Sequence, residues 1–121
     1  MSDERHEDEL KSAMHHNTGT GRNFEDISRV LASWYVPPES YDDRNGVWLV
    51  EFNDGQRVAF FGWHDSSGWD CQSGLDLLPF ETWEERLRED SDRGFSGAWA
   101  MWAGEREAII QHIKQQLEAS R

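Results

Sequence analysis

The sequence is short of cysteine, of long apolar runs and of positive charge, and each shortage excludes a class of protein. A single cysteine, Cys71, excludes an internal disulfide framework, so packing must stabilise the fold, and a reducing cytoplasm is the expected compartment. No apolar run approaches the roughly 18 residues of a membrane span, and the acidic N-terminus is unlike a secretory signal.

Positive charge is scarce and unevenly placed. Twelve Lys and Arg face 24 Asp and Glu, which gives a net charge of −12. Residues 39–92 hold 14 of the acidic residues and only 4 of the basic ones. Direct binding to nucleic-acid phosphates or to an anionic membrane needs cationic side chains and is therefore disfavoured. A partner with a basic surface is favoured instead.

Signatures of established enzyme families are also missing. The sequence contains no nucleophile elbow and no phosphate-binding Walker loop, and Gly19-Thr20-Gly21 lacks the preceding strand that a dinucleotide fingerprint requires. The sequence therefore predicts a protein that is not an enzyme and that needs no cofactor.

The N-terminal part of the chain divides into a polar tail and an apolar-periodic segment. Residues 1–22 are nearly free of large apolar groups, so burial cannot offset the entropy of ordering, and a disordered acidic tail is expected. From Asn23, which can cap a helix, apolar residues recur at helical spacing until Pro37, namely Phe24, Ile27, Leu31 and Trp34. This pattern predicts a core helix at the start of a single domain, residues 23–121.

The centre of the expected fold is a hairpin. Two runs rich in β-branched and aromatic residues, 47–52 and 57–63, flank the pair Asp54-Gly55, which favours a tight turn. These runs predict two antiparallel strands, and the apolar run 75–80 predicts a third.

Alternation within residues 47–52 separates two faces of the first strand. One face carries Val47, Leu49 and Glu51, and the other carries Trp48, Val50 and Phe52. Only the second set is wholly apolar, so that face is expected to meet the core.

The loop after the hairpin holds chemically versatile side chains. Its tryptophans, Trp63 and Trp69, bracket four candidate metal ligands or acid/base groups: His64, Asp65, Asp70 and Cys71. The alternative is that the aspartates form turn hydrogen bonds and the cysteine is a small buried hydrophobe. The adjacent His-Asp and Asp-Cys pairs lack the spacing of established zinc motifs, and no metal is predicted.

Part of this region resembles a known group of proteins. The run LVEFNDG followed by FFGWHDSSGWDCQSGLD is similar to a segment of small acidic proteins of actinobacteria and their phages. The resemblance covers about a quarter of the chain. It implies a phage or actinobacterial origin, and the host cytoplasm if the protein is phage-encoded, but no activity or site residue.

Two helices are expected after the third strand. Thr82 and Glu85 have the spacing of a capping box, which predicts a helix over 83–90. This helix has an acidic outer surface that includes Glu84, Glu85 and Glu89. A longer helix over 97–119 carries an apolar stripe that either fills the core or supports a homodimer through the C-terminal helix.

Together these elements predict an α+β fold: a small antiparallel sheet, made of the hairpin and a third strand, with an N-terminal helix and two C-terminal helices on one face. The predicted function is that of a non-enzymatic interaction or regulatory protein. Its partner-binding residues are expected in the loop and on the acidic helix: Trp63, His64, Asp65, Trp69, Asp70, Glu84, Glu85 and Glu89.

Two other functions remain open at this point. The first is a DNA mimic that occupies the basic groove of a nucleic-acid-binding protein, in which case binding should collapse with salt. The second is a metal site, structural or catalytic, in the loop 64–71.

Overall fold

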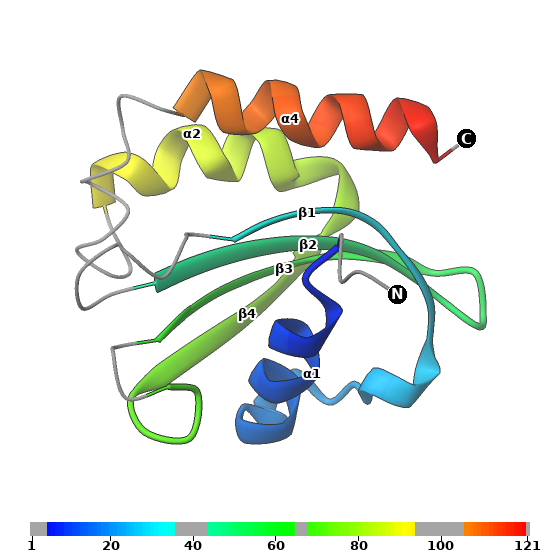
Figure 1. Ribbon diagram of the computed structural model, residues 1–121, viewed down its shortest axis with the longest axis vertical. Coiled ribbons are helices and arrows are strands. Elements are labelled where there is room, and N and C mark those ends of the chain that lie inside the picture. Colours follow the sequence, from blue (N-terminus) through cyan, green and yellow to red (C-terminus); the bar gives the residue numbers. More distant parts are fainter. Residues whose placement is uncertain (1–4, 36–43, 65–67, 94–105, 121) are drawn as a thin grey trace.

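The computed structural model describes residues 5–35, 44–64, 68–93 and 106–120, and for residues 44, 89–93 and 106 it describes the backbone alone. The fold is α+β, as predicted (Figure 1). The elements follow in the order α1 (Glu7–His16), β1 (Ile27–Tyr35), β2 (Arg44–Phe52), β3 (Arg57–His64), β4 (Ser73–Pro79), α2 (Trp83–Arg93) and α4 (Arg106–Ala119).

The four strands form one antiparallel sheet in which each strand pairs with the next along the chain. The predicted hairpin is confirmed, with Trp48 opposite Phe60 across β2 and β3, and the predicted third strand is β4. The turn uses Gly55 at a φ of 89°, a conformation that glycine adopts without a steric penalty. The sheet has one strand more than predicted.

The additional strand is β1, and the prediction of a helix in this segment is wrong. Four consecutive residues of β1, from Val30 to Ser33, are buried, because the sheet is covered on both faces. A strand buried on both sides shows no alternation, so its apolar residues matched a helical spacing by chance. Pro37, which was expected to end the helix, lies outside the described residues.

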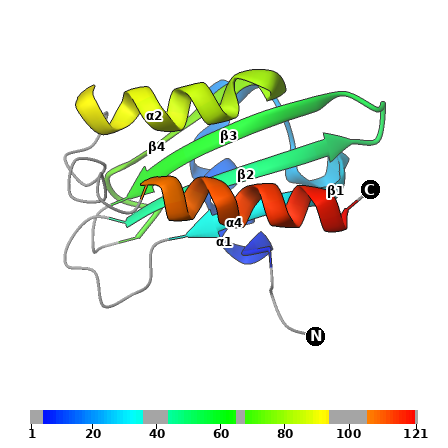
Figure 2. The same cartoon turned by 90° about the horizontal axis from the view of Figure 1, so that it is seen from above.

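Helices α2 and α4 lie on one face of the sheet, with α4 over β1 and α2 toward β3 and β4 (Figure 2). The core on this side is mostly aliphatic. It is formed by Ala32, Val47, Leu49, Ala59, Phe61, Trp83, Leu87, Ile109, Ile110 and Ile113. The expectation that Val47 and Leu49 point away from the core is therefore wrong, because the sheet has two buried faces.

Helix α1 covers the opposite face (Figure 1). The core there is richer in aromatic rings and consists of Leu10, Ala13, Met14, Val30, Trp48, Val50, Phe52, Val58, Phe60 and Trp69. The prediction of a disordered tail is thus wrong for residues 5–22. The helix buries only three of its own side chains, which is too few to stand out in a polar sequence.

The C-terminal helices differ in detail from the prediction. Helix α2 begins at Trp83 as expected and continues to Arg93. The hydroxyl of Thr82 donates a hydrogen bond to the carbonyl of Pro79, 2.7 Å away, in place of the expected capping-box bond. The last helix is described from Arg106, and residues 97–105 of the predicted range lie outside the described residues. In the described part of the chain, no helix has both the length and the apolar character of a membrane span.

Candidate functional site

The loop residues singled out in the sequence do not form one surface. His64 and Trp69 are buried on the α1 face of the sheet, 6% exposed each. Trp63 is half-buried, and its ring lies beside Gly74 of β4. Asp70 and Cys71 are exposed, and Asp65 lies outside the described residues. In this structure His64 and Trp69 are therefore part of the core and do not offer a surface to a partner.

His64 is held at the end of β3 by aromatic neighbours. Its Nε2 atom lies 2.7 Å from the hydroxyl of Tyr35 on β1, a hydrogen bond whose donor depends on the histidine tautomer. The ring of Trp69 packs against the imidazole, with 4.5 Å between the ring centroids. Trp69 thus covers the imidazole on one side, and the histidine is buried.

Further hydrogen bonds join α1 to the same place. The indole of Trp48 donates to the carbonyl oxygen of His6 at 3.0 Å, and the indole of Trp69 donates to Oε1 of Glu9 at 2.9 Å. Nδ1 of His6 lies 3.1 Å from the hydroxyl of Ser33. We call this group the docking cluster of α1; it comprises His6, Glu9, Ser33, Tyr35, Trp48, His64 and Trp69.

Only part of this cluster lies in segments whose sequence pattern predicts its place, namely the hairpin and loop residues Trp48, His64 and Trp69. His6, Glu9, Ser33 and Tyr35 come from segments assigned to a tail and to a helix, so no local pattern could place them beside the loop. One signal was present, because a buried tryptophan usually needs a hydrogen-bond acceptor for its indole N–H. With seven tryptophans in the chain, partners had to be sought outside the hairpin.

Two glycines make room for the large rings of the cluster. A Cβ atom at Gly46 would lie 2.3 Å from the Trp48 ring, and one at Gly62 would lie 3.0 Å from the Trp69 ring. The two glycines are opposite each other across β2 and β3. The two rings therefore occupy space that a side chain at either glycine would need.

The acidic helix face is partly neutralised by neighbouring cations. Glu84 lies 3.0 Å from Arg88 and 3.3 Å from Lys114 of α4, and Arg88 also pairs with Glu107. The hydrogen bond from Arg88 holds the pKa of Glu84 below its ordinary value, with Lys114 contributing to the same effect. The bond to Glu107 raises the pKa of Arg88. Glu85 is exposed, and the side chain of Glu89 lies outside the described residues.

Metal binding finds little support in the part of the chain that the structure describes. No three histidine, cysteine, aspartate or glutamate side chains there are close enough together to hold an ion. Of the four candidate ligands in the loop, His64 is buried against Trp69 while Cys71 is exposed, and Asp65 is among the residues not described.

A pocket of about 490 Å³ lies beside α1, away from all of the predicted site residues. Met14 and Phe24 supply its apolar part, and its polar lining includes Lys11, His15, Arg22 and Glu25. Arg22 is already engaged: its guanidinium lies 3.7 Å from the centre of the Phe52 ring and 3.0 Å from Oε1 of Gln56. One of the cations that line the pocket is therefore already held by neighbouring side chains.

The candidate surface that remains is centred on β4. Asp70 precedes this strand, Asp76 lies within it, and Glu81, Glu84 and Glu85 follow it. The exposed acidic residues of the two predicted regions are thus separated by one edge strand of the sheet. Comparison with protein-family models, with curated proteins and with solved structures finds no match to this chain.

Proposed function

We propose that the protein is a non-enzymatic interaction protein that binds a partner with a basic surface. The observation that supports this proposal is that many arginine and lysine side chains already form ion pairs within the chain. Arginine and lysine side chains lie within 4.0 Å of carboxylates at several places, and those engaged are Arg22, Arg29, Arg57, Arg86, Arg88 and Lys114.

The acidic excess is consequently left on the surface. Within the described residues, five exposed acidic side chains have no cation within ion-pair distance: Glu25, Asp26, Asp70, Glu81 and Glu85. Exposed carboxylates without internal partners create a negative potential that attracts cationic surfaces and accelerates their association.

The positions of these five residues indicate which edge of the sheet the partner contacts. Asp70 and Glu81 flank the two ends of β4, and Glu85 lies one helical turn further along the chain. Glu25 and Asp26 lie before β1, the strand at the opposite edge of the sheet. We therefore expect the partner to contact the β4 side, and the two groups provide a matched comparison.

The test begins with the full chain as bait, with retained proteins identified by mass spectrometry and each pair rebuilt from purified components. Calorimetry then compares Glu81→Gln/Glu85→Gln with Glu25→Gln/Asp26→Asn, which change the net charge equally. The first variant should weaken binding about tenfold, since each rim charge contributes a few tenths to 1 kcal/mol. The second should change affinity by less than about twofold.

Three results would contradict the proposal. The first is an equal loss in both variants, which would show that only overall charge matters. The second is an unchanged affinity in both. The third is binding that does not weaken as salt is raised, because exposed charge pairs are screened by salt.

A further inference from the structure

The two edge strands of the sheet, β1 and β4, differ in how many side chains bond to their backbone. At the β1 edge, α4 and the residue that follows it supply side chains that bond to the strand backbone. The N–H of Ser33 donates to Oε1 of Gln116 at 2.7 Å, and the hydroxyl of Ser120 donates to the carbonyl of Leu31 at 2.9 Å. Two irregularities in the pairing of β1 with β2 distort this edge further. Capped and bulged edges of this kind resist pairing with another strand.

Helix α1 and the short helix Thr18–Thr20 lie near β4. In the described part of the chain, however, no side chain bonds to the β4 backbone between Ser73 and Leu78, and the bond from Asn17 to Ser73 reaches only its hydroxyl. The strand pairs with β3 from Ser73 to Pro79, so one side of its backbone is directed away from the sheet. Among the described residues, the backbone hydrogen bonds of β4 are those with β3 and the bond from Thr82 to the carbonyl of Pro79. Ordinary strand geometry gives this edge a length of about 20 Å.

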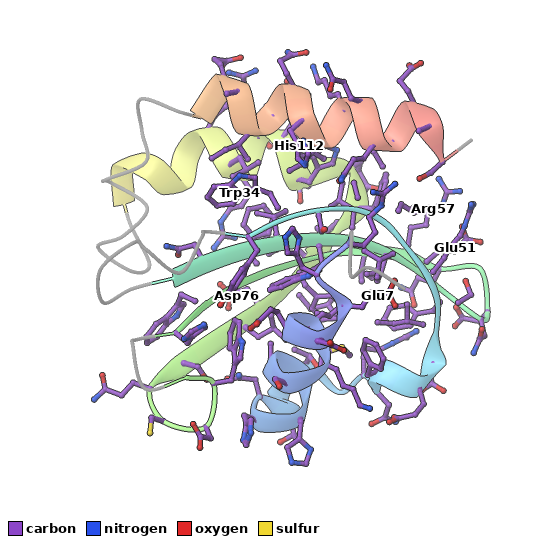
Figure 3. All side chains as sticks on the ribbon, in the orientation of Figure 1. Glu7, Trp34, Glu51, Arg57, Asp76 and His112 are labelled. Atoms are coloured by element: carbon purple, nitrogen blue, oxygen red, sulfur yellow. The ribbon has the colours of Figure 1, made fainter. Side chains whose placement is uncertain are left out.

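The side chains along the edge alternate in chemistry. Leu75 and Leu77 lie opposite Gly62 and Phe60, on the α1 face, and both are only half-buried. Asp76 lies opposite Phe61, on the other face, and its side chain is 49% exposed. Asp76 is labelled in Figure 3. Its partner Arg86 is 3.5 Å away, a surface pair of small energetic value. A strand added here would meet two leucines on one face and a carboxylate on the other.

We propose that the β4 edge receives an extended segment of a partner protein, in which a lysine or arginine facing Asp76 lies between two apolar residues that contact Leu75 and Leu77. Backbone hydrogen bonds would supply affinity, and the alternating side chains would supply specificity. This inference rests on the proposed function, in which a partner with a basic surface is attracted by the acids at the two ends of the strand, Asp70 and Glu81.

A second copy of this chain is a poorer occupant. Antiparallel pairing of β4 with itself over its full length centres on Asp76 and places two aspartates directly opposite each other, which is destabilising. Each copy also carries a net charge of −12, so the two bodies repel each other. Asp76 thus opposes self-pairing and favours a cationic strand.

The test screens a displayed library of random peptides of about ten residues, enough to span the strand, against the full chain. Enriched peptides should show the apolar–basic–apolar alternation. On titration they should shift the amide resonances of Gly74, Asp76 and Leu78 and slow the hydrogen exchange of β4. Methylation of alternate peptide nitrogens, which removes backbone donors but keeps every charge, should weaken binding more than tenfold.

Protein variants provide the second part of the test. Asp76→Lys should weaken binding at least tenfold, and a peptide with glutamate in place of its basic residue should restore it. Asp76→Asn is the milder variant and should give an intermediate loss. Glu25→Lys, before β1 at the other edge of the sheet, makes the same charge change and should leave affinity within about twofold.

The outcomes separate this inference from the proposed function. If basic peptides bind, but methylated ones bind equally well and β4 resonances do not shift, the edge proposal fails while the acidic-surface proposal stands. If enriched peptides protect β4 without any preference for basic residues, the edge binds strands, but the basic residue assigned opposite Asp76 is wrong and the acidic-surface proposal fails with it. No enrichment, or a concentration-dependent dimer that protects β4, would overturn the edge proposal.

Discussion

The two faces of the sheet are covered by different kinds of contact. Helices α2 and α4 contribute mainly aliphatic side chains, Leu87 and three isoleucines, to their side. Helix α1 contributes Leu10, Ala13 and Met14 and is further held by indole hydrogen bonds. The comparison shows that a short polar helix can dock stably where the sheet itself offers large rings and hydrogen-bond donors. If both faces stabilise the fold, substitutions on either side should lower the free energy of unfolding.

The largest effects are expected from one leucine on each face. Leu10→Ala and Leu87→Ala each empty a site that is 0–1% exposed in the native protein. Each should lower the free energy of unfolding by about 2–5 kcal/mol, as measured by urea denaturation. If Leu10→Ala has no effect while Leu87→Ala does, α1 is not an integral part of the fold.

A smaller effect is expected from Gly46→Ala. The added methyl group would lie 2.3 Å from the Trp48 ring, so the indole must move and its bond to the carbonyl of His6 must lengthen. Overpacking of this kind costs about 1–3 kcal/mol. Gly19→Ala is a suitable control, because a Cβ atom there meets nothing within 4 Å. Equal stability of the two variants would show that Trp48 does not depend on Gly46.

The indole bond to Glu9 should contribute about 1 kcal/mol. A double-mutant cycle of Trp69→Phe and Glu9→Ala isolates this contribution from the loss of ring area. The coupling free energy from urea denaturation should be close to that value. A coupling near zero would mean that the bond seen at 2.9 Å does not hold α1 in solution.

The smallest effect is the pH dependence of stability that comes from two glutamates on the α2/α4 side of the sheet. Arg88 lowers the pKa of Glu84, and Arg29, followed by Arg57, lowers the pKa of Glu51, from an ordinary value of 4.5 in both cases. A lowered folded-state pKa contributes stability that is full above the unfolded value and is lost as pH falls through the folded value.

Urea midpoints should therefore decline as pH drops below about 4.5, and the decline should be shallower in Glu51→Gln and in Glu84→Gln than in the unaltered protein. Both side chains are partly exposed, so the difference is small and should shrink further in high salt. A steeper decline in either variant would show that the pKa of that glutamate is not lowered in the folded protein.

The sequence revealed the elements whose signals are local. The hairpin was predicted because its strands combine β-branched and aromatic residues with an Asp-Gly turn, and α2 because Trp83 and Leu87 lie one turn apart. It did not reveal β1, whose consecutive buried residues depend on helices far along the chain. It did not reveal α1 either, because what holds this helix is supplied by Trp48 and Trp69.

The candidate site was predicted in part for the same reason. Charge is visible in composition, so the acids around β4, including Asp70 and Glu85, were correctly expected to be exposed. Composition does not reveal whether a loop residue is buried, and His64 and Trp69, both predicted to bind a partner, are buried in the structure. The open edge of β4 follows from the strand order, which only the three-dimensional arrangement determines.

The bond between Glu9 and Trp69 joins residues 60 positions apart, whereas each strand pairs with its immediate neighbour in the chain. During synthesis, α1 leaves the ribosome well before the surface that receives it exists. Leu10 and Met14 must therefore stay in water until β3 and the segment after it have emerged, and the N-terminal helix attaches only then.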